Sequence, residues 1–282
     1  MTISYHMIEL IKIIPIILFK MKINQTTYQP RGLKMLKKIE RAMIINLLLV
    51  VFILSPVSAD SVDNSLFTDL LKKHVTGPRV DYAGFKTDEA QLDQYLDILS
   101  RTDHASLSSA EQFAFFVNVY NAFTIKLVLT EYPGIDSIKD IGSFFSTPWK
   151  IRFIPLKDQK VTLDEVEHEI LRPTFKDPRI HFAVNCASIG CPPLRPEAFE
   201  GDRLEEQLNE QTTAFINGPG NVKIDGNTIY VSKIFRWFKE DFIGGPVSFV
   251  RQYASPDLLV RIDAMGDNVR VKYLDYDWAL NK

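Results

Sequence analysis

A long apolar helix is predicted at about Ser109–Glu131, and every other element of the chain has to pack around it. Ser108 stands three residues before Glu111, which is the spacing of a capping box at the start of a helix. The segment Tyr132–Gly134 contains a proline and a glycine and ends the helix. Between these limits apolar residues occur on nearly all sides, and a helix of this kind is normally buried. We therefore expect it at the centre of the core.

Shorter predicted elements surround this helix. Helical periodicity or capping signals occur in Ser65–Val75, Asp88–Leu99, Leu163–Leu171 (ending before Pro173), Leu204–Phe215, Phe249–Tyr253 and Asp257–Leu259, and Ile234–Phe242 is expected to be a short helix or a loop. Strands are predicted at Arg179–Cys186, at Val269–Leu274, and in a hairpin formed by Val222–Ile224, Asp225-Gly226-Asn227 and Ile229–Val231. Helices dominate, so we expect a single helix-rich α+β domain with a small, mostly antiparallel sheet, for which a papain-like arrangement is one candidate.

The N-terminal residues have the pattern of an export signal. Lys37, Lys38 and Arg41 precede an apolar run at 44–54, and Val57-Ser58-Ala59 supplies the small residues of a cleavage site. The run is too short to cross a bilayer about 30 Å thick. We expect a signal peptide at 35–59, with an uncleaved anchor as the alternative, and a domain at 60–282. Residues 1–34 precede the basic segment and are interpreted as a gene-model extension.

Charge and export narrow the possible partners. From Asp60 onward the chain carries 25 of its 33 Lys and Arg and 33 of its 35 Asp and Glu, a net charge of −8. An acidic globule has no general attraction to phosphate backbones, so no nucleic-acid partner is expected. The expected location is periplasmic or secreted, without a stable membrane span after signal cleavage. A small molecule or a peptide is the expected ligand, and the sequence does not predict the oligomeric state.

The residues best suited to chemistry follow one predicted strand. His181, Asn185 and Cys186 lie together there, and turns after strands are common active-site positions. A nucleophilic cysteine must be a thiolate, which requires a nearby base or cation. His181 is the candidate base for Cys186, and Asn185 or Asn121 is the candidate to orient the imidazole or donate to an oxyanion. In an ideal strand His181 and Cys186 would point to opposite faces, so the chain must turn between them.

The two cysteines, Cys186 and Cys191, allow other interpretations. In an exported protein they can form a small disulfide loop, or they can be inert buried thiols. A zinc site would add His181 to the two cysteines, but it lacks a clear fourth ligand and the tight spacing of common zinc motifs. No metal site and no cofactor are therefore predicted.

Two further clusters contain candidate site residues. Glu167 and His168 are adjacent on a predicted helix, which is either a solvated face or presents one of the two as an acid or base. Polar residues also interrupt the long apolar helix, where they either bond neighbouring backbone or orient the 181–186 segment and line a pocket. The candidate pocket residues are Asn118, Tyr120, Ser188 and Trp237.

These motifs together resemble a known family. The segments that carry the resemblance are Val80-Asp81-Tyr82, Phe115–Leu129, Pro148-Trp149, Leu163–Arg172, Asp177–Pro193, Ser232–Phe242 and Tyr276–Asn281. They are similar to the domain-of-unknown-function 547 family over nearly the whole mature chain. The resemblance includes the Glu167-His168 pair and the His181, Asn185, Cys186 and Cys191 positions, but it implies no particular reaction.

Two functions are compatible with these observations. The first is a cysteine-dependent hydrolase or acyltransferase that acts on a small amide, thioester or peptide, with Cys186 as nucleophile. The second is a non-catalytic binding module of the cell envelope in which Cys186 and Cys191 form a structural disulfide. A redox protein that cycles this pair is less favoured, because the spacing is wider than Cys-x-x-Cys.

Overall fold

The computed structural model describes residues 61–142, 146–157, 159–266 and 268–282. The described residues form one compact unit. The predicted signal peptide at 35–59 and the preceding residues 1–34 lie outside the described residues.

The long helix α6 (Ser109–Glu131) lies in the core, as its composition predicts. Its first turn is capped by Ser108, whose hydroxyl accepts the Glu111 N–H at 3.3 Å. By length and composition this helix alone, among the described residues, could cross a membrane, but 89% of its apolar window is buried inside the protein. Burial by the rest of the chain accounts for its apolar character.

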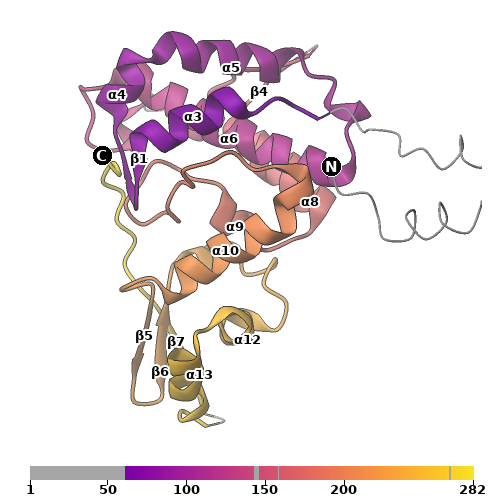
Figure 1. Cartoon of the computed structure of the whole chain (residues 1–282). Coiled ribbons are helices and arrows are strands. Elements are labelled where there is room, and N and C mark those ends of the chain that lie inside the picture. The colour runs from indigo at the N-terminus through magenta and orange to yellow at the C-terminus, as the bar shows by residue number, and fades with distance from the viewer. Residues whose placement is uncertain (1–60, 143–145, 158, 267) are drawn as a thin grey trace, which may run out of the picture. The chain divides into compact units, whose positions relative to one another are not determined.

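The first part of the unit consists mainly of helices packed around α6 (Figure 1). Before α6 the elements are α3 (Ser65–His74), β1 (Val75–Thr76), β2 (Arg79–Val80), α4 (Tyr82–Thr87), α5 (Glu89–Arg101) and η1 (His104–Ser106). After α6 they are η2 (Ile138–Asp140), η3 (Pro148–Lys150), β3 (Ile154–Leu156), β4 (Gln159–Val161), α7 (Leu163–Glu165), η4 (Val166–Leu171), α8 (Arg172–Phe175) and α9 (Ile180–Ala183). Their buried side chains form one hydrophobic cluster that includes most of α6.

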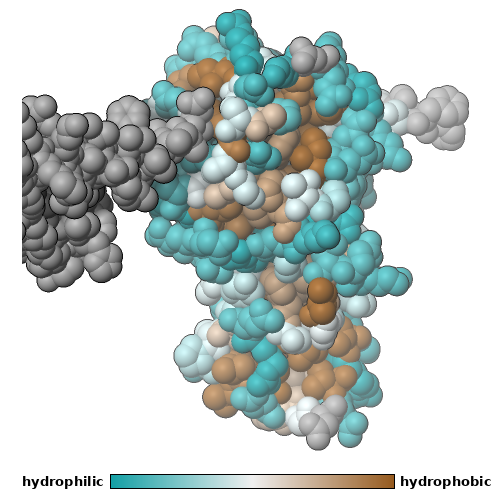
Figure 2. Space-filling model, turned by 90° about the vertical axis from the view of Figure 1, so that its right-hand side faces the viewer, coloured by the Kyte–Doolittle hydropathy of each residue, from teal (hydrophilic) through white to brown (hydrophobic). Residues whose placement is uncertain are grey.

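The second part has its own hydrophobic cluster. Its elements are η5 (Gly201–Arg203), α10 (Leu204–Asn217), β5 (Val222–Asp225), β6 (Thr228–Val231), α11 (Ile234–Trp237), α12 (Gly245–Tyr253), α13 (Pro256–Asp263) and β7 (Arg270–Tyr273). β5 and β6 form the predicted antiparallel hairpin, and β7 pairs with β6 in parallel (Figure 1). The face in Figure 2 mixes hydrophilic and hydrophobic residues, with a hydrophilic band between the two parts.

The α+β class and the helix-rich composition are confirmed. Three of the four strand pairings are antiparallel, as expected for a mostly antiparallel sheet. The β1–β2 and β3–β4 pairs were not predicted, because strands of two or three residues are too short to show a period. Nothing in the observed topology adds support for a papain-like arrangement.

The segment Arg179–Cys186 is not a strand, contrary to the sequence prediction. Residues Ile180–Ala183 form the short helix α9, and all four side chains are buried. The Asp177 carboxylate accepts the Arg179 N–H at 2.9 Å and so stabilises the turn that starts the helix. A short run that is apolar throughout has no period to separate a buried strand from a buried helical turn, which explains the error.

The helix predicted at Leu163–Leu171 continues through Pro173 to Phe175. Its middle, η4, is a π-helix in which the Arg172 N–H bonds to the carbonyl of Glu167, five residues earlier. A proline removes one N–H donor and normally interrupts an α-helix. The wider π turns do not use the i−4 bonding pattern, so the helix passes Pro173 without ending. Such wide turns occur often at functional sites.

The C-terminal tail joins distant segments of the first part. The Asn281 carbonyl accepts the Val80 N–H at 2.8 Å, and the Asn281 side chain accepts the Tyr82 hydroxyl at 2.7 Å. Further up the tail, the carbonyls of Asp277 and Ala279 accept the N–H groups of Gly190 and Ile189, both at 2.9 Å. In Figure 1 this yellow segment runs from β7 to the neighbourhood of β1. The tail therefore holds the cysteine-bearing loop against the body of the protein.

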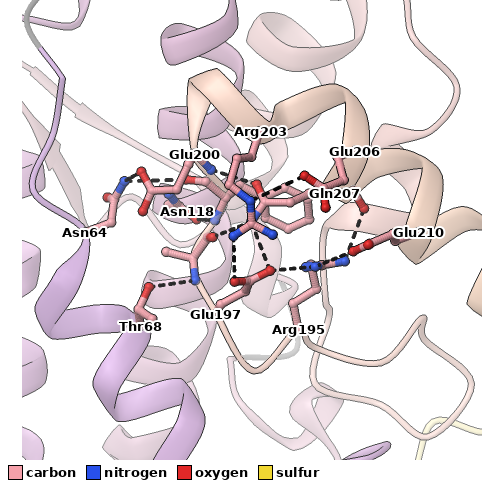
Figure 3. A network of polar contacts seen from close by, with 12 residues as sticks. Asn64, Thr68, Asn118, Arg195, Glu197, Glu200, Arg203, Glu206, Gln207 and Glu210 are labelled. Carbon is pink, nitrogen blue, oxygen red and sulfur yellow. Dashed lines mark hydrogen bonds and ion pairs between the residues drawn. The ribbon is translucent and has the colours of Figure 1, made fainter. Parts of the chain in front are cut away.

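A buried polar network fastens α6 to the loop before α10 (Figure 3). The Asn118 amide donates to the carbonyl of Phe199 at 2.8 Å, and its oxygen accepts the Phe199 N–H at 2.9 Å. Asn118 was predicted as a pocket residue, but the structure places it in this structural network. Both hydrogen-bonding ends of the amide are used by backbone, which satisfies a buried polar group.

Glu197 is the charged centre of the same network (Figure 3). Its carboxylate accepts hydrogen bonds from Arg195 at 2.6 Å, Arg203 at 3.0 Å and Gln207 at 3.3 Å. Burial by itself would raise the pKa of Glu197, but these hydrogen bonds outweigh burial and lower the pKa from 4.5 to about 2. The carboxylate consequently stabilises the fold most when it is ionised.

We predict that Glu197→Gln destabilises the protein at pH 7 by up to about 3 kcal/mol, the free energy that corresponds to this pKa shift. Because the folded pKa is lowered, the stabilisation is complete above pH 4.5 and is lost as the pH falls toward 2. The difference from wild type should therefore shrink over that range. Urea unfolding at several pH values measures it. The control is Glu206→Gln, since Glu206 is largely exposed and bonds only Arg203, at 3.5 Å. An equal pH response in both variants would contradict the prediction.

Candidate functional site

A cavity of about 180 Å³ lies beside the cysteine loop. Five segments supply its wall: α6, η3, the α7–η4 helix, the 181–192 segment and the region from α11 to the tail. Its lining residues are Tyr120, Trp149, Asp164, Glu167, His168, His181, Cys186, Cys191, Pro192, Ile234, Trp237, Phe238, Tyr276 and Trp278. The cavity is close in size to one that holds a single benzene, so it fits a small group rather than a large ligand.

The loop from Cys186 to Cys191 is held rigidly by buried amides. The Asn121 amide donates to the Ala183 carbonyl at 3.0 Å and accepts the Asn185 N–H at 2.8 Å. The Asn185 side chain donates to the Pro192 carbonyl at 2.8 Å and accepts the Ala187 N–H at 2.9 Å. Asn121 therefore orients the segment after α9, and Asn185 ties the two ends of the loop together. Neither amide lines the cavity.

The backbone of Ala187 is also held rigidly in this loop. This residue is buried and has φ of +60°, a left-handed conformation that costs a non-glycine residue about 1 kcal/mol. Its N–H and carbonyl are both hydrogen-bonded, the carbonyl to the Asn281 N–H at 3.2 Å. The surrounding bonds over-determine the conformation, as is common in loops that position functional groups.

Three polar side chains contact the Cys186 sulfur. Cys191 Sγ lies 2.9 Å away, Tyr276 Oη 3.1 Å and Ser188 Oγ 3.2 Å. Ser188 also donates to the Tyr276 hydroxyl at 3.0 Å, which leaves the Tyr276 proton directed at the sulfur. Both cysteines are free thiols. The sulfur thus has three polar neighbours, of which Tyr276 donates to it and Ser188 supports Tyr276, and it faces the cavity.

The two thiols differ in acidity. The hydrogen bond with Cys191 lowers the pKa of Cys186, and the contacts with Ser188 and Tyr276 act in the same direction against burial. Burial raises the pKa of Cys191 well above its usual value, and the hydrogen bond with Cys186 raises it further. These directions favour Cys186 as the first of the two thiols to ionise.

A row of alternating charges lies on the opposite wall. His181 Nε2 bonds Asp241 Oδ2 at 2.6 Å, and His181 Nδ1 lies 3.7 Å from Glu167 Oε1. Arg172 continues the row with a hydrogen bond from Nε to Asp241 Oδ2 at 2.6 Å. His181 is almost fully buried and stacks on Phe238 with ring centroids 3.9 Å apart.

The charges in this row shift the pKa values of His181 and Glu167 in opposite directions. Burial would lower the pKa of His181, but the bond to Asp241 and the facing Glu167 outweigh it and raise the pKa. Burial would likewise raise the pKa of Glu167, but the nearby His181 and a hydrogen bond from Tyr120 lower it. The site therefore holds a buried imidazolium between two carboxylates.

His181 does not pair with Cys186, contrary to the sequence expectation. Both ring nitrogens face carboxylates, so no lone pair remains to accept the thiol proton. His168 lies at the cavity rim, where its Nδ1 is 3.0 Å from Arg172 Nη1. Arginine can only donate, so this nitrogen carries the lone pair and the ring is neutral. Glu167 and His168 both line the cavity, although neighbouring residues of a helix point in different directions.

Several site residues were not singled out from the sequence. Asp241 and Arg172 complete the charge row, Tyr276 bonds the sulfur, and Trp149 and Trp278 form part of the aromatic wall. All five fall within segments that carry the family resemblance. Their roles depend on tertiary contacts that no local pattern encodes. Of the predicted pocket residues, Tyr120 and Trp237 line the cavity and Ser188 lies behind Cys186.

Among the described residues, no group of three or more His, Cys, Asp or Glu side chains is arranged to hold a metal ion. The fold and the cavity thus define an α+β protein with a thiol beside a buried acid–imidazolium row. Its central part, residues 104–216, matches the model of the family described as "Protein of unknown function, DUF547". The resemblance is confirmed over this range and not over nearly the whole mature chain. No curated protein and no solved structure shows significant similarity to the chain.

We predict that Asp241→Asn lowers the pKa of His181, because it removes the strongest contact that favours the imidazolium. With a raised folded pKa, the stability from His181 is complete below pH 6.5 and is lost as the pH rises through the folded pKa. NMR titration of the imidazole measures the shift. Glu240→Gln is the matched control, since Glu240 contacts Arg172 at 3.2 Å but not His181. An unchanged His181 titration in Asp241→Asn would refute this assignment.

Proposed function

We propose that the protein is a cysteine-dependent hydrolase or acyltransferase with Cys186 as its nucleophile, acting on a small amide, thioester or peptide. The observation that carries the proposal is the environment of the Cys186 sulfur. This sulfur lines the cavity and is contacted by Cys191 Sγ at 2.9 Å, Tyr276 Oη at 3.1 Å and Ser188 Oγ at 3.2 Å. A nucleophilic cysteine requires a thiolate, and polar contacts of this kind stabilise one.

The proposed reaction starts from the Cys186 thiolate. Its sulfur attacks the carbonyl carbon to form a C–S bond, the bond to the leaving group breaks, and the leaving group takes up a proton from solvent water, which leaves a thioester on Cys186. Once the sulfur is acylated it no longer attracts the Tyr276 proton, so this hydroxyl can donate to the oxyanion instead. The Tyr276 oxygen lies 3.1 Å from the sulfur, close to where that oxyanion would form.

Glu167 is the proposed base for the second step. It is a buried carboxylate on the cavity wall, kept ionised by His181 and oriented by Tyr120. It accepts the proton of the attacking water or acceptor, which then breaks the C–S bond and regenerates the thiolate. Asn121 and Asn185 are assigned as positioning residues rather than catalytic ones, since both bond only backbone or another buried amide.

A second function remains a candidate because the two sulfur atoms are only 2.9 Å apart. We also propose export to the periplasm or the medium, and in an oxidising compartment such a pair can form a disulfide. The protein would then be a non-catalytic binding module of the cell envelope with a Cys186–Cys191 clip. Under this alternative the thiols would react only after reduction.

Thiol alkylation separates the two functions. Iodoacetamide is applied across pH 5 to 9, with and without prior reduction, and the modified peptides are identified by mass. If Cys186 is the nucleophile, it reacts well below pH 8 and Cys191 does not react. We further expect Tyr276→Phe to slow the alkylation at pH 7 about threefold, because the lost hydrogen bond raises the Cys186 pKa and increased nucleophilicity compensates in part. The control, Tyr273→Phe, lies on β7 away from the cavity and should not change the rate.

Acyl transfer itself is tested with small activated thioesters and esters. We expect one acyl group per chain, attached to Cys186 and then released to water or to an added amine. Cys186→Ser should fold normally and lose turnover by several orders of magnitude. A folded Cys186→Ala protein that retains full turnover, or an unmodified Cys186 after exposure to all donors, would sink the proposal.

A further inference from the structure

We propose that the cavity binds an alkylammonium group, so that the small molecule processed at this site carries a positively charged amine close to its reacting carbonyl. The reaction part of this statement rests on the proposed function, whereas the binding of the cation does not. Three independent features of the cavity wall support the inference: its aromatic rings, its charge, and a lysine of the chain that already occupies one of the rings.

The aromatic rings are concentrated at this site to an unusual degree. The chain contains three tryptophans, and all three line the cavity. Trp237 and Trp278 have ring centroids 5.7 Å apart, and Tyr276 lies 4.8 Å and 4.6 Å from them. Trp149 contacts Trp278 edge-on at 5.7 Å. Aromatic faces arranged in this way attract ammonium cations through the negative charge of their π systems.

The charges on the cavity wall also favour a cationic ligand. The carboxylates of Asp164 and Glu167 line the cavity, and no lysine or arginine does so among the described residues. His168 is neutral, because its Nδ1 accepts from Arg172. His181 carries a positive charge, but Glu167 and Asp241 already neutralise it from both sides. Asp164 is left with only His168 nearby, at 3.7 Å. The wall is therefore net negative and selects against anionic groups.

Lys139 provides the third observation. Its ammonium nitrogen lies 3.5 Å from the centroid of the Trp278 ring. The chain thus already places a cation on the ring of Trp278, and Trp278 also lines the cavity. The same group presents further rings toward the cavity, and Trp237 is 42% exposed, so a ligand can reach it from solvent.

Size limits the ligand to a small cation. A cavity of about 180 Å³ holds a butylammonium or tetramethylammonium group but not a long peptide or a second ring system. Carboxylate oxygens can accept N–H donors from a primary ammonium, and the rings suit a methylated one. The shared chemistry is the alkylammonium charge, and the experiment distinguishes the two forms.

Intrinsic fluorescence tests the inference directly, because every tryptophan of the chain lines the site. The purified protein is titrated at constant ionic strength with butylammonium, tetramethylammonium, butanol and butyrate. We expect saturable changes with the cations and none with butanol or butyrate over the same range. Saturation by only one of the two cations still supports the inference and identifies the site as one for primary or for quaternary ammonium. Equal affinity for butanol and butylammonium, or no saturable change at all, would overturn it.

Matched variants locate the binding. Glu167→Gln removes a charge from the wall and should weaken cation binding about tenfold. Glu169→Gln, an exposed residue of the same π-helix that does not line the cavity, should leave it unchanged. Glu167 contacts a buried histidine, so Asp164→Asn serves as a second variant at a partly exposed position where folding is not at risk. Cation affinity that is unchanged in both variants would refute the inference.

Failure of this inference can be told apart from failure of the proposed function. Cation binding is measured in Cys186→Ala, where no acyl transfer is possible. Binding there without acylation of the wild-type protein by any donor would leave the inference standing and remove the reaction. Acylation by donors with and without an amine at the same rate, together with no fluorescence change, would leave the reaction standing and remove the inference.

Discussion

The site is organised by one buried charge, the His181 imidazolium. Its side chain is almost inaccessible to water, and it is held at 2.6 Å from Asp241 and 3.7 Å from Glu167. Burial of an ion costs several kcal/mol, which only close partners offset, and removal of one partner typically costs about 3–5 kcal/mol. The three residues come from α9, η4 and the segment after α11. Their mutual requirement therefore fixes how these segments meet.

The same charge lies where the two hydrophobic clusters meet. On α9, Ile180 and Ala183 belong to the first cluster, while Phe182 belongs to the second. His181 stands between them in the chain and stacks on Phe238, which packs against the second cluster. The apolar residues of α9 thus pack in both clusters, and its one polar residue, His181, belongs to the charge row. A cavity beside that row has a rigid wall, because any movement of α9 would disturb both clusters.

The sequence predicted the parts of this arrangement that depend on local physics. The 23-residue α6 and the β5–β6 hairpin follow from composition and turn residues alone, and both lie where expected. The apolar run that forms α9 was recognised, but four buried residues in a row carry no period, so it was predicted as a strand and not as a helix. The π-helix was missed for a different reason, since proline rules describe α-helices and not wider turns.

The candidate site was likewise predictable only in part: the residue types could be recognised from the sequence, but their partners could not. Cys186 and His181 were identified from the requirements of thiolate chemistry, and Glu167 as a candidate acid or base, but their pairing could not be derived. His181 was assigned to Cys186 because the two are close in sequence. In the structure its partner is Asp241, which lies 60 positions away in the chain and within hydrogen-bond distance. Asn121 and Asn185 were foreseen as orienting groups, and the structure has them orient the loop backbone rather than the imidazole. Long-range contacts decided every one of these roles.

The side chains in direct contact with the Cys186 sulfur carry no positive charge. Cysteine nucleophiles are commonly activated by an adjacent cation or histidine, yet Cys186 is contacted by a thiol and two hydroxyls instead. Neutral donors stabilise a thiolate by about 1.5–3 kcal/mol each, while Glu167 acts against it. Lys139 already interacts electrostatically with Cys186, and an ammonium group on the proposed ligand would add a second positive charge beside both anions. The aromatic wall, the acidic residues and the contacts of the Cys186 sulfur are all compatible with such a ligand.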